Sequence, residues 1–370
     1  MISGLLPASL LKMLQRVDLV LLAALSLLMF MGLVTLYSAA DTQLSTVYRQ
    51  GIHFAIGLVL MLLFSQVEGK TLRQFAIWLY GIGIVLLILV LMVGVIKKGA
   101  QRWLYVGIDI QPAEMMKLAV PMMVAYYFSE KPLPPRFLDI IVALILVGIP
   151  MVLIMKQPDL GTALLVALAG LFVIYLAGMS WWLIGGSIAA VAIAAPLMFN
   201  YGMYEYQRQR ILTLFNSESD LLGTGYHIFQ SKIAIGSGGL YGKGWLSGDQ
   251  SHLDFLPERH TDFIFAVFGE EFGFLGNLLL LGLYVFIIWR GLYIASKGAD
   301  TFSRLLAGSL SLTFFIYLVV NTGMVSGVLP VVGIPLPLVS YGGTSVVTLM
   351  SAFGIIMGMK KRKRIYQTDE

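Results

Sequence analysis

Charged and ionisable side chains gather in one short segment that runs directly into a long apolar stretch. Glu258, Arg259, His260 and Asp262 lie close together, and the residues from Phe263 onward are mostly apolar. A carboxylate at the centre of a bilayer costs roughly 2.5–3.5 kcal/mol on insertion scales, so a chain rarely keeps one near that region without a task. We therefore predict a site at a membrane surface, with Asp262 as its general base or cation ligand.

A structural role for this segment is also open. Thr261 or Asp262 could cap the helix that follows, by accepting hydrogen bonds from free backbone amides. A cap does not need Glu258, Arg259 and His260 beside it, which favours the functional interpretation. An exposed aspartate has a pKa of about 3.9, which is low for a base, and partial burial at the bilayer edge would raise that pKa.

Two other apolar segments carry acidic side chains. Glu114 and Lys117 are spaced i, i+3 on one helix face, where they would form a structural ion pair or hold the lysine toward an anionic headgroup. Asp159, directly after Gln157 and Pro158, would cap the next helix or belong to the same site.

Arg208 and Arg210 lie in a hydrophilic loop on the side of the membrane that normally holds few basic residues. Arginine matches phosphate oxygens with a bidentate pair of donors. We therefore predict that these two arginines bind a lipid diphosphate at the membrane surface.

Other kinds of site are not indicated. Lys243 follows Gly242, but Gly244 stands where a P-loop has serine or threonine, so no nucleotide site is predicted. The histidines show no metal-binding spacing, which argues against a zinc hydrolase. Cysteine is absent, which excludes disulfides and thiolate metal sites.

The composition is that of a membrane protein. Hydrophobic residues make up 58% of the 370 residues and charged residues 12%, against about 45–50% and about 25% in soluble domains. The mean hydropathy is +0.85. The net charge of +5 is modest for a nucleic-acid binder, and basic residues at membrane edges explain it better, so we expect no nucleic-acid partner.

The elements that must position these residues are membrane-spanning helices. We predict an all-α polytopic membrane protein whose residues 1–370 form a single transmembrane domain. A span needs about 20 apolar residues, and ten segments come close to or exceed that length. They are residues 17–38, 48–67, 73–95, 112–129, 137–156, 160–178, 181–199, 263–295, 304–328 and 342–359.

Basic residues set the orientation, because Lys and Arg favour the cytoplasmic loops. With both termini in the cytoplasm, the inner segments hold most of the lysines and arginines that lie outside the large loop of residues 200–262. They are Lys12, Arg16, Lys70, Arg73, Lys131, Arg136, Arg290, Lys297, Arg304 and the tail Lys360–Arg364, whereas the short outer loops hold Arg49, Lys97, Lys98, Arg102 and Lys156.

Two segments are not ordinary loops. The large extracytoplasmic loop, residues 200–262 between the seventh and eighth spans, contains the mixed polar and apolar Ile228–Ile235, which is typical of an interfacial helix. Gly236–Gly244 then supplies a turn-rich break. Gly327–Gly343 is apolar but rich in proline and glycine, so it cannot face lipid as a regular helix and must fold back into the protein or line a cavity.

Four motifs lie in order along essentially the whole chain: Gln111–Lys117, Gln157–Thr162, Leu256–Phe263 and Pro335–Gly343. Together they resemble the SEDS family (shape, elongation, division and sporulation proteins) of bacterial peptidoglycan glycosyltransferases. Ala113 is one departure, because serine is commoner there in the family. Within the family, the chain is more similar to the elongation enzymes than to a division polymerase.

The resemblance implies polymerisation of lipid II into glycan strands at the outer face of the bacterial inner membrane, for cell elongation and rod shape. The family's essential aspartate falls on Asp262, its Glu–Lys pair on Glu114 and Lys117, and a further aspartate on Asp159. The expected partners are lipid II, the lipid-linked nascent glycan, a class B penicillin-binding protein and other membrane proteins of the elongation complex.

In the mechanism that this implies, Asp262 deprotonates the acceptor sugar hydroxyl, directly or with Mg²⁺ or Mn²⁺ as a ligand. Arg208, Arg210 and Lys117 would steady the departing diphosphate. Glu258 and His260 are expected to contact substrate or to support Asp262. No nucleotide is needed, because a glycosyl diphosphate carries its own driving force.

Two other functions fit a polytopic protein with these charges. A lipid II flippase would need polar groups along a path through the membrane midplane, whereas the charges here map to one face. A scaffold that only recruits the cross-linking enzyme would leave the charges around Asp262 unexplained.

Overall fold

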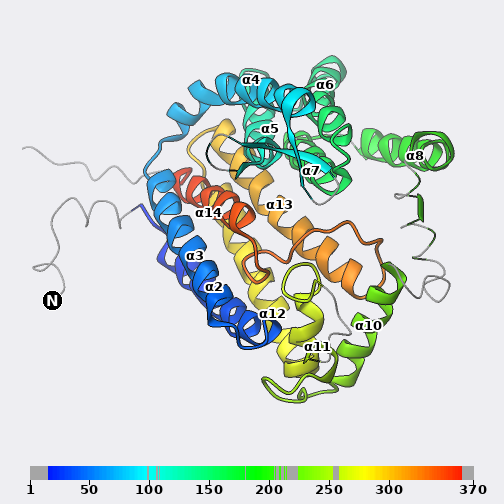
Figure 1. Cartoon of the computed structure of the whole chain (residues 1–370). Helices are drawn as coiled ribbons and strands as arrows, with labels where there is room; N and C mark the ends of the chain where they lie inside the picture. The colour runs from blue at the N-terminus through cyan, green and yellow to red at the C-terminus, as the bar shows by residue number, and fades with distance from the viewer. Residues whose placement is uncertain are drawn as a thin grey trace, which may run out of the picture.

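The computed structural model describes residues 16–97, 100–105, 107, 109–179, 181–203, 205, 208–209, 212, 214, 224–252 and 258–360. Long helices form a bundle in this part of the chain, with α10 and α11 gathered at one end of it (Figure 1). Residues 1–15, Arg210, residues 215–223 and residues 361–370 are among those that lie outside the described part.

Every segment predicted to span the membrane is helical, and the helix ends differ from the predicted ends by only a few residues. These helices are α2 (Leu19–Ala39), α3 (Leu44–Ser65), α4 (Gly69–Val93), α5 (Pro112–Ser129), α6 (Phe137–Met155), α7 (Leu160–Leu176), α8 (Trp181–Leu197), α12 (Ile264–Ser296), α13 (Thr301–Val325) and α14 (Gly343–Gly358).

Six of the helices in the described residues, α2, α3, α4, α6, α12 and α13, are long and apolar enough to cross a membrane. The helices α7 and α14 are apolar but shorter. The chain therefore has the build of a multi-pass membrane protein. The predicted interfacial segment is also helical, as part of α10 (Thr224–Ser237), and a one-turn helix, α11 (Asp249–His252), follows it.

The prediction of an all-α fold missed one small sheet. Between α4 and α5 the strands β1 (Val95–Lys97), β2 (Ala100–Tyr105) and β3 (Asp109–Ile110) pair antiparallel in the order β1-β2-β3. β-Branched and aromatic residues in a segment too short to span a membrane favour such a hairpin. The sheet matters for the site because β2 carries Arg102.

The helix α13 lies at the centre of the bundle. Of its most apolar stretch 72% is buried inside the protein, against 22% for α3 and for α4. It packs against α12, α7 and α5, and the hydroxyl of Ser309 donates to the carbonyl oxygen of Ala169 in α7 at 2.6 Å. Several polar side chains of α13 are buried in the protein: Ser303, Ser309, Ser311, Thr313 and Asn321.

Residues 328–341 have no regular helix or strand and fold back among the helices, which confirms the prediction for Gly327–Gly343. The side chains of Leu336 and Val339 in this segment are buried. The hydroxyl of Tyr284 in α12 donates to the carbonyl oxygen of Pro337 at 2.5 Å. We call residues 328–342 the internal wall, because this segment lies among the helices and forms hydrogen bonds with protein groups rather than facing lipid.

Three of the described basic residues assigned to the inner side, Arg73, Arg290 and Lys360, lie at one end of the bundle. There the carboxylate of Asp18 accepts hydrogen bonds from Arg290, at 3.0 and 2.9 Å, and from Lys360 at 3.1 Å. Arg73 pairs with Glu130 at the same end. The residues proposed for chemistry lie at the opposite end.

Candidate functional site

Asp262 lies in the turn directly before α12 and is half-buried. The residue at the N-cap position of α12 is Phe263, not Thr261 or Asp262, and its side chain makes no capping hydrogen bond. The side-chain amide of Asn321 in α13 donates to the backbone oxygens of Asp262, at 2.9 Å, and of Ile334, at 2.8 Å. Asp262 is therefore held between the central helix and the internal wall.

The wall closely approaches the carboxylate itself. Gly333 has a φ of +70°, and a Cβ there would lie 3.4 Å from Oδ2 of Asp262. A side chain larger than methyl at this position would cover the carboxylate, so glycine leaves it accessible as well as permitting the backbone conformation.

The charged residues just before Asp262 bond to different partners. Arg259 is buried and pairs with Asp41 in the turn between α2 and α3. Glu258 is exposed and accepts a hydrogen bond from the hydroxyl of Thr261 at 2.7 Å. His260, in contrast, bonds directly to the internal wall.

His260 contacts the end of that wall. Its carbonyl oxygen accepts a hydrogen bond from the backbone amide of Tyr341 at 2.9 Å. The rings of the two residues are 6.3 Å apart, edge to face. His260 is half-buried, two residues before Asp262 in the chain.

The predicted pairing of Glu114 with Lys117 is confirmed, with 2.6 Å between Nζ and Oε1. Lys117 is only 5% exposed, and its ammonium lies 5.2 Å from the centre of the Tyr317 ring. Tyr317 and Asn321 are one helical turn apart on the same face of α13. The ion pair therefore lies about one turn from Asp262 along the central helix.

Asp159 performs the capping role and also faces other side chains. Its Oδ1 accepts a hydrogen bond from the backbone amide of Thr162 at 3.1 Å, which confirms the cap. Its Oδ2 lies 3.5 Å from Nε of Arg102 and 3.4 Å from Nε2 of Gln111. Arg102 also donates to the carbonyl oxygen of Pro158 at 2.6 Å.

Asp159 is joined to the same wall as Asp262. A Cβ on Gly161, two residues after Asp159, would lie 2.9 Å from the carbonyl oxygen of Val332. Val332 immediately precedes Gly333, which approaches the Asp262 carboxylate. Asp159 and Asp262 thus flank one short stretch of backbone.

Arg208 is not part of this assembly. Its guanidinium donates to the carbonyl oxygens of Phe199 and Asn200, at 3.0 and 2.9 Å, and pairs with Glu205 at 3.5 Å. These contacts hold it near the end of α8, which projects away from the bundle (Figure 1). Arg210 lies outside the described residues. The role predicted for these two arginines stays a prediction.

Several residues of the site were not singled out from the sequence. Tyr317 and Asn321 line it from α13, and Arg102 reaches it from the sheet. Gln50 in α3 holds the wall in place, donating to the oxygen of Ser340 at 3.3 Å and accepting from the amide of Gly342 at 3.2 Å. Polar side chains inside apolar spans were the available signal for the helical ones.

The helix that follows Asp262, α12, is broken. Gly273 in α12 has non-helical angles, φ +67° and ψ −164°, which releases backbone groups on both sides. The glycine-rich loop 236–244 bonds with these groups. The amides of Lys243 and Gly244 donate to the oxygens of Glu270 and Glu271 at 3.0 Å each, and the amides of Phe274 and Leu275 donate to the oxygens of Gly239 and Leu240 at 2.8 and 3.1 Å.

Side chains add to this attachment. The carboxylate of Glu270, which is fully buried, accepts from Nζ of Lys243 at 2.8 Å and from the amide of Gln250 at 3.1 Å. Glu271 accepts from the hydroxyl of Ser38 in α2 and from the amide of Leu246 at 3.2 Å. The loop and the first half of α12 thus form one unit, with Asp262 at its end.

The described residues contain no group of three or more His, Asp or Glu side chains that converge as a metal site. This arrangement still fits a shared cation. Mg²⁺ is commonly bound by one or two carboxylates together with substrate phosphates, and the half-buried Asp262 supplies one carboxylate at the site. A cation here would therefore take its other ligands from substrate and water.

The fold and the site define a multi-pass membrane protein with a half-buried acidic residue at one end of its helix bundle and a buried Glu–Lys ion pair near it. Residues 12–365 match the family of cell cycle proteins FtsW, RodA and SpoVE. The chain belongs to this family.

The relatives indicate which branch of the family this chain is similar to. The peptidoglycan glycosyltransferase MrdB of Escherichia coli K12 is 51% identical over 346 residues, 93% of each chain. The probable peptidoglycan glycosyltransferase FtsW of Trichlorobacter lovleyi is 35% identical over 364 residues, 94% of this chain and 93% of its own. The greater similarity to MrdB confirms the expected likeness to the elongation enzymes.

Solved structures share the fold. A peptidoglycan synthase complex that coordinates polymerization and crosslinking contains a chain 30% identical to this one, with a TM-score of 0.80, covering 92% of this chain and 96% of that one. The rod shape determining protein RodA of Thermus thermophilus is 30% identical, with a TM-score of 0.69, covering 92% and 95%.

Proposed function

We propose that this protein is a peptidoglycan glycosyltransferase that polymerises lipid II into glycan strands for cell elongation and rod shape. The similarity to MrdB supports the activity. The assignment of the active site rests on the position of Asp262. It is half-buried at one end of the bundle, fixed by Asn321, and shares a wall with Asp159.

In the proposed reaction, the carboxylate of Asp262 accepts the proton of the 4-hydroxyl of the acceptor lipid II sugar. That oxygen forms a bond to the anomeric carbon of the lipid-linked strand, with inversion, as the bond from that carbon to the diphosphate breaks. The diphosphate leaves with its lipid and the electron pair. A positioned base of this kind contributes about 10²–10⁴-fold to a rate.

The cationic side chains tied to the site by contacts are Arg102 and Lys117, and we assign them the diphosphate. Arg102 is the better placed arginine, because its contact with Asp159 brings it to the wall beside Asp262, whereas Arg208 is held at α8. Mg²⁺ or Mn²⁺ bound by Asp262 would add positive charge at the same oxygens.

We infer the membrane arrangement from the same elements. The ten helices predicted as spans each cross the bacterial inner membrane, within a single domain of residues 1–370. The end that holds Asp18, Arg290 and Lys360 faces the cytoplasm with both termini, because basic residues favour that side. The site and the loop of residues 200–262 then face outward.

The expected protein partner is a class B penicillin-binding protein, which would cross-link the strand as it leaves. The related chain in a complex that coordinates polymerization and crosslinking supports this pairing. Other membrane proteins of the elongation complex are expected partners as well.

The test is synthesis of glycan from fluorescent lipid II by the full-length protein reconstituted with its penicillin-binding partner. Asp262→Asn keeps the shape of the side chain and should lower the rate at least 100-fold, by the loss of a base. Asp109→Asn, at an exposed strand of the sheet, is the matched control and should polymerise normally. Near wild-type synthesis by Asp262→Asn would refute the assignment.

The same assay separates the other possibilities. Polymer formation excludes a protein that only transports lipid II. A chelator that stops synthesis, with recovery after Mg²⁺ or Mn²⁺ is restored, would support the shared cation, and unchanged synthesis would make Asp262 a base without metal.

A further inference from the structure

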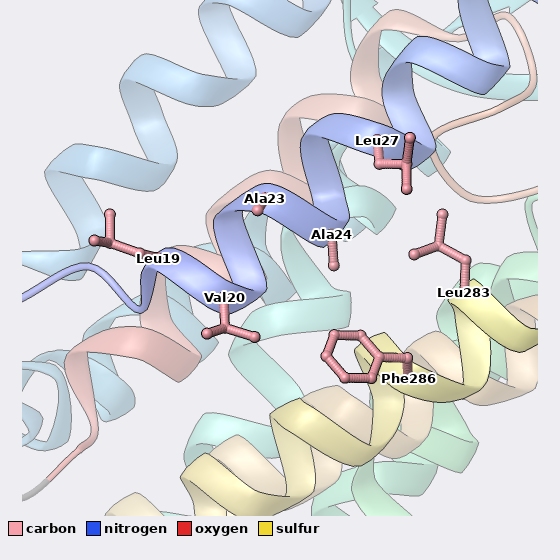
Figure 2. A pocket seen from close by; sticks show the side chains of 7 residues that line it. All are labelled: Leu19, Val20, Ala23, Ala24, Leu27, Leu283 and Phe286. Carbon is pink, nitrogen blue, oxygen red and sulfur yellow. The ribbon is translucent and has the colours of Figure 1, made fainter.

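A second feature of the molecule, at the opposite end from Asp262, is an apolar groove between α2 and α12. Its volume is about 480 Å³. Figure 2 shows Leu283 and Phe286 of α12 facing the side chains of α2 across this space. The α2 wall includes Leu19, Val20, Ala23 and Leu27.

The walls are open to the lipid. Leu19 is 62% exposed and Leu27 49% exposed, although both lie in an apolar span. Ala23 is small and exposed between them, which makes the wall concave. A space of this shape on a membrane face suits a flexible hydrocarbon chain.

The groove is closed at one end by charge. Asp18 directly precedes the α2 wall, and Arg290 lies one turn after Phe286 on α12. The ion pair between Asp18 and Arg290 spans the same two helices that form the groove, with bonds of 3.0 and 2.9 Å. Lys360 joins it at 3.1 Å from Asp18.

Aromatic rings line the path from the groove to these cations. The ring of Trp289 lies 5.8 Å from that of Phe286 and 6.1 Å from that of Tyr293. Arg290 and Lys297 both lie over Tyr293, at 5.1 and 5.8 Å from its centre. Trp and Tyr prefer the headgroup level of a membrane, and basic side chains lie just beyond it.

Cationic side chains outnumber carboxylates around the mouth of the groove, even when Asp300 at the N-cap of α13 is counted beside Asp18. Arg290, Lys297 and Lys360 are cationic, and Asp18 is the acidic side chain that pairs with two of them. Lys297 is exposed. Positive side chains at the cytoplasmic mouth of a groove between helices are suited to an anionic lipid headgroup.

We propose that this groove is a binding site for an anionic phospholipid of the inner leaflet. One acyl chain lies along Ala23 and Leu27, and the phosphate is bound at Arg290, Lys297 and Lys360. A lipid fits the order of the features, because it carries its charge at one end and its hydrocarbon at the other. A partner helix would instead present apolar residues along the whole groove.

The experiment measures lipid retention and does not depend on glycan synthesis. The full-length protein is equilibrated with mixed micelles that hold equal amounts of phosphatidylglycerol and phosphatidylethanolamine, and retained lipid is counted by native mass spectrometry. Wild-type protein should retain phosphatidylglycerol in preference. Lys297→Gln combined with Lys360→Gln should lower that preference on the order of tenfold.

Two controls make the result specific. Lys70→Gln combined with Arg136→Gln removes the same number of charges from exposed positions at the same end of the bundle, and should keep the preference. Ala23→Trp fills the groove and should remove the retained lipid, whereas Ser26→Trp, exposed on the same helix outside the groove, should not.

Leu283→Trp fills the groove from the α12 wall and provides a second measurement of lipid retention if Ala23→Trp does not fold. Retention by folded Leu283→Trp equal to wild type would overturn the proposal. An unchanged preference in the double lysine variant would also overturn it, because the bound lipid would then be ordinary surrounding lipid. If a groove-filling variant retained as much lipid as wild type but lost a protein that copurifies with wild type, the groove would be assigned to a helix of that protein instead.

Discussion

The attachment of loop 236–244 to the break in α12 can be tested with two alanine substitutions. Gly242 and Gly239 both have positive φ, +82° and +54°. A Cβ on Gly242 would come within 3.0 Å of the backbone oxygen of Glu271, whereas a Cβ on Gly239 meets nothing within 4 Å. The pair therefore separates the conformational cost from the loss of contact with the helix.

The expected magnitudes follow from these contacts. Both alanines incur the left-handed cost of roughly 1–2 kcal/mol. Gly242→Ala must in addition move the loop away from α12, which breaks the bonds from Lys243 and Gly244 to the first half of the helix. Each such bond contributes about 1 kcal/mol. The free energy of unfolding should therefore fall by about 2 kcal/mol more for Gly242→Ala than for Gly239→Ala.

The assay is unfolding of the full-length protein in mixed micelles with increasing denaturant, followed by helix content. A difference of ~2 kcal/mol corresponds to roughly thirtyfold in the folding equilibrium. Glycan synthesis should fall further in Gly242→Ala, since the loop and Asp262 share one unit. Equal destabilisation by the two alanines would show that the loop does not support α12.

Other predictions concern the site and the opposite end. Glu114→Gln leaves the buried Lys117 without its carboxylate partner and should lower the free energy of unfolding by about 3–5 kcal/mol. Adding Lys117→Met to this variant should restore part of the lost stability, and denaturant midpoints of both variants measure the difference. Asn321→Leu should abolish glycan synthesis by releasing the backbone of Asp262, with retained helix content by circular dichroism as the check. Burial alone would raise the pKa of Asp18, but hydrogen bonds from its two cationic partners hold that pKa below the ordinary 3.8. The ionised Asp18 therefore contributes its full stabilisation above pH 3.8, the ordinary pKa that it has in the unfolded chain. That stabilisation is lost as the pH falls through the lower pKa of the folded protein, and unfolding measured at a series of acid pH values tests this.

The positions of the helices could be predicted because apolar length alone decides them. Residues 112–129 were predicted as a span, and α5 has the same bounds, since Pro112 is suited to a first helical turn and polar residues follow Ser129. The chemistry at Glu114 and Lys117 was equally local, because i, i+3 spacing brings two side chains together on any helix.

Features that depend on distant parts of the chain could not be predicted. Gly273 gives no local sign of a break, because the backbone groups that bond to the broken helix come from the distant loop 236–244. The position of Arg208 and Arg210 in the predicted outer loop indicated a phosphate site, which stays a prediction. Nothing local showed that Arg208 contacts residues at the end of α8, which stands away from the bundle. Arg102 reaches the site only through a sheet that hydropathy did not reveal.

The internal wall has a mechanical consequence. Residues 328–342 bond to Gln50 of α3, Tyr284 of α12 and Asn321 of α13, and pack against Gly161 of α7. Since one stretch of backbone touches all four helices, a tilt of any of them displaces the surface beside the carboxylate. A change in helix packing at a distance from Asp262 would therefore alter the shape of the site.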